Sequence, residues 1–98
     1  MTMTQVLYAL EVAQCQNVSR AAERLLLSQS ALSQQLRRLE QELGYPIFTR
    51  TLHGVQLTPE GERFCEQAAG MARTWKEFQA NVQKSALGIR KRLRIGMG

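Results

Sequence analysis

The stretch SQSALSQQLRRLE, residues 28 to 40, decides the fold, because it has the pattern of an amphipathic helix with an unusual polar face. Leu32, Leu36 and Leu39 recur at helical spacing, continue to Leu43, and predict one buried face. At 100° per residue, the opposite face carries Ser30, Gln34, Arg37, Arg38 and Gln41, with Ser33 on its flank. A solvated helix face normally mixes Glu with Lys in pairs, whereas this one is mostly amides and hydroxyls with two arginines. It suggests a surface that binds something.

Two further helices are expected on the N-terminal side of this stretch. We expect a first helix from an N-cap at Thr4 to about Gln16, and a second helix capped by Asn17 or Ser19. Ser28 is a suitable cap for the third helix, and Gly44 is suited to end it. The segment from 18 to 37 therefore fits a helix-turn-helix, with small Ala22 at the helix crossing and Leu26 where such turns usually carry glycine.

A hairpin and a long helix are expected on the C-terminal side. Residues 47–49 and 55–57 are strand-prone, and Gly54 suits the turn between them, so they predict a two-stranded wing. Thr58, Pro59 and Glu60 then form a strong helix start. This helix is expected to run to about Leu87. The fold class is therefore mainly α, a winged helix-turn-helix with a long C-terminal linker helix.

The linker helix carries an apolar seam that predicts a dimer. The seam residues alternate at spacings of four and three, as in a heptad: Phe64, Ala68, Met71, Trp75, Phe78 and Val82. Phe64 and Ala68 can pack on the chain's own domain, but the helix is too long for the later residues to do so. Exposing Met71, Trp75, Phe78 and Val82 would leave a large apolar patch, and a second copy of the chain is its simplest cover.

Composition limits the other functions. Of the formal charge of +5, Arg90, Lys91, Arg92 and Arg94 supply +4, so the domain itself is close to neutral and a DNA surface must depend on local placement. Cys15 and Cys65 fit reduced thiols in a cytoplasmic protein, and no membrane span is expected. With no aspartate, one histidine and no phosphate loop or metal-ligand pattern, we expect no enzyme, no catalytic residues, no metal and no cofactor.

Four blocks together resemble the N-terminal region of LysR-type transcriptional regulators: RAAERL at 20–25, SQSALSQQLRRLEQELG at 28–44, IFTR at 47–50 and LTPEG at 57–61. The similarity covers essentially the whole chain. It implies a DNA-binding domain at 1–58, a linker and dimerisation helix at 59–87, and a hinge at 88–98 in which RLRIGMG begins an effector-binding domain. It further implies a homodimer, a tetramer at full length, an interrupted inverted repeat in double-stranded DNA as target, and a small-molecule co-inducer bound outside this chain.

The same resemblance assigns candidate DNA contacts. It places Ser28, Gln29, Ser30, Ser33 and Gln34 at the end of the recognition helix that meets bases and phosphates. Arg37 and Arg38 would lie further along that helix, and Arg50 and His53 on the wing near the backbone or minor groove. Many relatives have proline at the position of Ser30 and a basic residue at that of Gln34, so whether this chain has a base preference of its own stays open at this point.

Two alternatives remain open at this stage. Another family of winged-helix regulators could share this fold. A protein-interaction module built on the heptad seam belongs to a different class, and it predicts no salt-dependent affinity for DNA.

Overall fold

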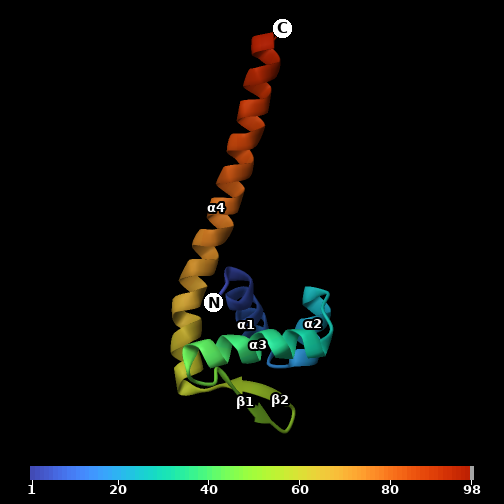
Figure 1. The fold of residues 1–98 in the computed structure, drawn as a ribbon, viewed down its shortest axis with the longest axis vertical. Helices are drawn as coiled ribbons and strands as arrows, with labels where there is room; N and C mark the ends of the chain where they lie inside the picture. Colours follow the sequence, from blue (N-terminus) through green and yellow to red (C-terminus); the bar gives the residue numbers. More distant parts are fainter. Residues whose placement is uncertain (98) are drawn as a thin grey trace.

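The structure is a computed structural model that describes the backbone of residues 1–97 and the side chains of residues 1–86. Three helices, a hairpin and a long fourth helix follow one another: α1 Met3–Cys15, α2 Val18–Leu25, α3 Gln29–Leu43, β1 Phe48–Thr51, β2 Gly54–Leu57 and α4 Pro59–Met97. The first three helices pack together, the hairpin lies along α3, and α4 leaves the domain as a long rod (Figure 1). The predicted fold class is confirmed.

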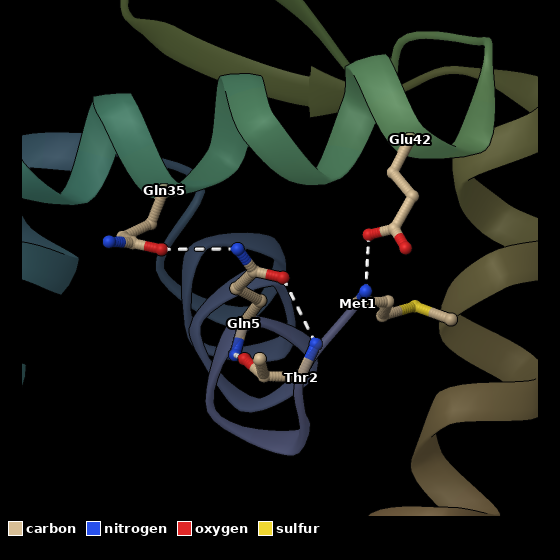
Figure 2. Close-up of polar contacts among 5 residues, drawn as sticks. All are labelled: Met1, Thr2, Gln5, Gln35 and Glu42. Carbon is tan, nitrogen blue, oxygen red and sulfur yellow. Dashed lines mark hydrogen bonds and ion pairs between the residues drawn. The ribbon is translucent and has the colours of Figure 1, made fainter.

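The first helix begins two residues earlier than the sequence predicted. Its N-cap is Thr2, not Thr4, and it ends at Cys15. The Thr2 hydroxyl accepts a hydrogen bond from the Gln5 backbone at 3.1 Å, and the Gln5 side chain accepts one from the Thr2 backbone at 3.0 Å (Figure 2). This reciprocal capping box needs a partner three residues on, and Thr2 with Gln5 provides it.

The caps of the next two helices agree with the prediction. Asn17 caps α2 by accepting a hydrogen bond from the Arg20 backbone at 3.0 Å, so Asn17 rather than Ser19 is the N-cap. Ser28 caps α3 through the Ala31 backbone at 3.1 Å, and Gly44 ends that helix with a φ of 83°. Leu26 turns the chain between α2 and α3 at a φ of 60°, the left-handed conformation for which glycine is usual.

The core lies where the three helices meet the start of the wing. Leu32, Leu39, Ile47 and Val12 are its largest fully buried side chains. Ala21 and Ala22 are also buried, and their small size lets α2 approach its neighbours closely. Leu36 is 6% exposed, so the leucine face predicted for the third helix is the face that packs inward. Its polar face is consequently turned outward.

The wing is a two-stranded antiparallel hairpin with a two-residue turn. Phe48 pairs with Leu57 and Thr51 with Gly54, so Leu52 and His53 form the tip. The Val55 backbone donates to the Gln16 carbonyl at 3.0 Å, which fastens the second strand to the end of α1. A β-carbon at Gly54 would lie 2.1 Å from the same carbonyl oxygen, so only glycine permits this contact.

The fourth helix starts as predicted and continues further than predicted. Thr58 accepts a hydrogen bond from the Gly61 backbone at 2.9 Å, with Pro59 as the first helical residue. The helix extends to Met97, whereas the sequence predicted an end near Leu87. Gly88 disfavours a helix by only about 1 kcal/mol, and the Leu, Arg and Lys residues after it favour one. The side chains at 88–98 lie outside the described residues, so the domain division there stays a prediction.

Candidate nucleic-acid interface

The predicted DNA-contacting residues lie on the outer face of α3, the candidate recognition helix, and on the wing. Ser28, Gln29, Ser30, Gln34, Arg37 and Arg38 are exposed, and Ser33 is half-buried. On the wing, Arg50 and His53 are exposed as well. These positions follow from the inward packing of Leu32, Leu36 and Leu39 described above.

A groove joins α3 to the wing and to the start of α2. Gln29 and Ser33 line it from α3, and Arg50 and His53 line it from the hairpin, around a volume of about 310 Å³. An adjoining hollow of about 270 Å³ shares Ser33 and Arg50 and adds Arg37. Residues that are far apart in the sequence therefore form one polar surface.

The remaining candidates border neither hollow. Ser28, Ser30, Gln34 and Arg38 lie outside the lining of both. Ser28 uses its hydroxyl oxygen to cap the helix and lies 3.3 Å from the Ser30 hydroxyl. Its hydroxyl can still donate to an anion at the helix N-terminus, where the unpaired backbone N–H groups and the helix dipole also favour negative charge.

Sequence reasoning missed three residues that line the groove: Asn17, Ser19 and Thr51. The Ser19 hydroxyl donates to the Gln29 side-chain oxygen at 2.7 Å, which orients the Gln29 amide group. Ser19 was considered only as a helix cap. A hydroxyl two residues into α2 gives no sequence signal that it faces α3, because that contact depends on the angle between the helices.

The recognition helix is tied to α1 by a polar contact on its other side. The Gln5 amide nitrogen donates to the Gln35 side-chain oxygen at 3.1 Å (Figure 2). The Met1 amino group also forms an ion pair with Glu42, near the end of α3 (Figure 2). Gln5 thus caps α1 and contacts α3 with one side chain.

The shape and chemistry of this surface suit double-stranded DNA. The major groove is about 12 Å wide and admits an α-helix, and serine, glutamine and arginine side chains can reach both base edges and phosphates. A wing beside that helix would lie over the sugar-phosphate backbone. Arg50 and His53 are exposed side chains of the wing that carry N–H groups able to donate hydrogen bonds.

A second surface runs along α4 and is apolar. Met71, Trp75 and Phe78 line a groove of about 660 Å³ together with Met3 of α1. The Trp75 and Phe78 rings stack with centroids 5.8 Å apart. Met71 is 57% exposed, Phe78 56% and Val82 49%, while Ala68 is buried against the domain. The seam therefore divides as predicted, into an inner part that packs on the domain and an outer part without cover in one chain.

Other kinds of site find little support in the part of the chain that the structure describes. No group of three or more His, Cys, Asp or Glu side chains is close enough there to hold a metal ion. Cys15 and Cys65 are free thiols, and burial raises the pKa of the Cys65 thiol, which disfavours the reactive thiolate. In the same part of the chain, no helix has the length and apolarity needed to cross a membrane.

Comparison with known proteins agrees with this geometry. Residues 3–62 match the model of the bacterial regulatory helix-turn-helix proteins of the LysR family. Over 90 residues the chain is 41% identical to the uncharacterised HTH-type transcriptional regulator YcgK of Bacillus subtilis, covering 92% of this chain and 28% of that protein. It is 42% identical over 84 residues to the HTH-type transcriptional regulator HdfR of Yersinia enterocolitica, covering 82% of this chain and 29% of the relative.

Solved structures show the same similarity. The DNA-binding domain of CbnR, solved in complex with DNA, superposes with a TM-score of 0.78 at 30% identity, covering 88% of this chain and 99% of that one. The BenM DNA-binding domain in complex with catB site 1 DNA gives a TM-score of 0.81 at 30% identity, and the match covers 90% of this chain and 95% of that one. A full-length OxyR from Pseudomonas aeruginosa gives 0.79 at 40% identity, covering 85% of this chain and 28% of that one.

These matches define the class of the domain, a winged helix-turn-helix of the kind that binds DNA. The chain belongs to the LysR family of bacterial transcriptional regulators and carries its DNA-binding domain. It spans a little under a third of the length of the curated relatives given above, at 28% and 29%.

Proposed function

We propose that this chain binds double-stranded DNA sequence-specifically as a homodimer, within a cytoplasmic transcriptional regulator that is not an enzyme. The observation that carries the proposal is the groove in which Gln29 and Ser33 of α3 face Arg50 and His53 of the wing. Such a surface can hold a helix in the major groove while the hairpin holds the backbone.

The residues divide by chemistry. Gln29, Ser33 and Gln34 are proposed to contact base edges, and Ser28 and Ser30 to bind bases or phosphate at the helix start. The remaining four would bind the backbone or the adjacent minor groove: Arg37, Arg38, Arg50 and His53. Phosphate contacts supply affinity that falls with salt, whereas base contacts supply sequence preference.

The apolar groove of α4 supports the homodimer. Met71, Trp75, Phe78 and Val82 would pack against the same residues of a second copy, burying aromatic surface that one chain exposes. Two recognition helices would then read two half-sites about one DNA turn apart, or a multiple of it, as in an interrupted inverted repeat. Tetramer formation and control by a small-molecule co-inducer are proposed for a full-length regulator.

Replacing Gln34 with alanine is expected to cost about 1 to 3 kcal/mol at one base pair and to relax the preference there. Gln34 is exposed on the outer face of α3, so its removal should leave the core intact. Fluorescence anisotropy titrations would use a duplex selected by the wild-type protein from a randomised library, and duplexes mutated at single base pairs. An equal loss of affinity on every duplex would contradict a base-reading role.

Replacing Arg50 with alanine is expected to weaken binding to all duplexes by a similar factor and to reduce the salt dependence by about one phosphate contact. The reason is that a guanidinium group on the wing is expected to bind the DNA sugar-phosphate backbone, which is the same for every base sequence. Titrations over a series of salt concentrations measure this slope. A loss confined to the selected duplex would show that Arg50 reads bases instead.

A further inference from the structure

Glu40 of α3 joins the recognition helix to the wing. One oxygen of its carboxylate accepts hydrogen bonds from the Ile47 backbone at 2.6 Å and the Phe48 backbone at 3.4 Å. Phe48 is the first residue of β1, so the carboxylate holds the chain where the wing begins. Among the described side chains of α3, no other makes a hydrogen bond to the wing.

Ile47, which Glu40 holds through its N–H group, has further contacts on its other side. Ile47 is fully buried, and its carbonyl oxygen accepts hydrogen bonds from the Thr58 backbone at 2.9 Å and the Thr58 hydroxyl at 3.2 Å. Ile47 is thus fixed through its N–H group by α3 and through its carbonyl group by the start of α4. A displacement of the Glu40 contact would move the entry of β1 relative to α3.

The wing depends on such anchors because a hairpin of two four-residue strands has little stability of its own. Its second strand is fastened to α1 through the Val55 backbone, and Val55 pairs with Arg50. Glu40 supplies the corresponding attachment of the first strand to the recognition helix. Both strands are thus attached to helices, and Arg50 of the first strand lines one hollow with Ser33 and Arg37.

Glu40 could also influence DNA binding through its negative charge, which is an alternative to attaching the wing. Glu40 lines the same hollow as Arg37 and Arg50, so its negative charge could lower the positive potential that DNA meets. However, Glu40 forms no ion pair with either arginine among the described residues, and its bonded oxygen accepts from backbone N–H groups. The contacts favour a role in geometry over a role in charge.

We propose that Glu40 is a positioning residue for DNA binding: through the Ile47 and Phe48 backbone it sets the wing at the distance from α3 at which Arg50 meets the phosphate backbone. This inference rests on the proposed function. It assigns a role in DNA binding to a residue whose observed hydrogen bonds go to the backbone of its own chain.

Two substitutions separate the effect of the length of the Glu40 side chain from the effect of its charge. Glu40→Gln keeps the length and the accepting oxygen but removes the charge, whereas Glu40→Asp keeps the charge but shortens the side chain by one methylene. Each is combined with Arg50→Ala in a double-mutant cycle, and affinity for the selected duplex is measured by anisotropy. Glu42→Ala, on an exposed residue of the same helix, is the matched control for the cycle.

Arg50→Ala is expected to weaken binding about five-fold in the wild type, in Glu40→Gln and in Glu42→Ala, but no more than about two-fold in Glu40→Asp. An unchanged Arg50 effect in Glu40→Asp would overturn the inference. So would a change in Glu40→Gln, which is expected to remain folded even if Glu40→Asp does not. Failure of the wild type to show salt-dependent, sequence-preferring affinity would instead overturn the proposed function itself.

Discussion

Replacing both Trp75 and Phe78 with glutamate is expected to convert a dimer into monomers and to weaken binding to a duplex with two half-sites by about 100-fold or more. In one chain Phe78 is 56% exposed, and Trp75 stacks on it in an apolar groove. Facing copies would bury these rings, and four carboxylates brought together there would carry a large desolvation and repulsion penalty. Without the dimer, each recognition helix binds its half-site alone and the gain from bivalency is lost.

Sedimentation equilibrium and anisotropy measure the two parts of this expectation separately. The matched control is Ala80→Glu with Gln83→Glu, which makes the same charge change at exposed positions of α4 that do not line the groove. This control is expected to stay dimeric and to retain most of its affinity. If the wild type and the seam variant both sediment as monomers, the seam is only a surface of the domain.

Sequence reasoning was most successful where structure depends on near neighbours. Ser28, Gly44 and Thr58 each act through residues three or four positions away, and all three have their predicted capping roles. The leucine spacing of α3 likewise predicted which face is buried, because helical periodicity alone determines it. Apart from the half-buried Ser33, the candidate DNA contacts on α3 are exposed for the same reason, although their roles stay predictions.

The missed features depend on contacts between elements. The hydrogen bond from the Ser19 hydroxyl to Gln29 depends on how α2 packs against α3, where Ala21 and Ala22 are buried. The close approach of Gly54 to the Gln16 carbonyl joins residues 38 positions apart in the sequence. No local pattern marks such pairs. The wing was predicted as a hairpin, but the anchors that place it were not.

The length of α4 shows a different limit of local reasoning. The sequence predicted an end near Leu87, before Gly88, yet the helix continues to Met97. A single residue that disfavours helix is outweighed when good helix formers follow it. The start of the first helix was also predicted wrongly, because Thr4 was judged as a single capping residue and the capping box formed by Thr2 and Gln5 was not considered. In both cases the sum over several residues decided the boundary.

Replacing Gly61 with alanine is expected to lower the free energy of unfolding by about 2 to 3 kcal/mol, although alanine favours helix over glycine by about 1 kcal/mol. A β-carbon at Gly61 would lie 2.1 Å from the Ile47 carbonyl oxygen and 2.9 Å from its carbon. That carbonyl already accepts two hydrogen bonds from Thr58, and Ile47 is fully buried. Moving the Ile47 carbonyl group away from the new β-carbon would therefore disrupt these hydrogen bonds or the packing of the core.

Urea unfolding followed by circular dichroism measures this change, with Gly70→Ala as the matched control on the same helix. Nothing lies within 4 Å of a β-carbon at Gly70, so that substitution is expected to stabilise by up to about 1 kcal/mol. Because Gly70 borders the apolar groove, both are compared in the Trp75→Glu, Phe78→Glu background. If Gly61→Ala stabilises as Gly70→Ala does, the start of α4 can slide along the domain. If it destabilises, α4 is held against Ile47, the same residue that Glu40 ties to the recognition helix.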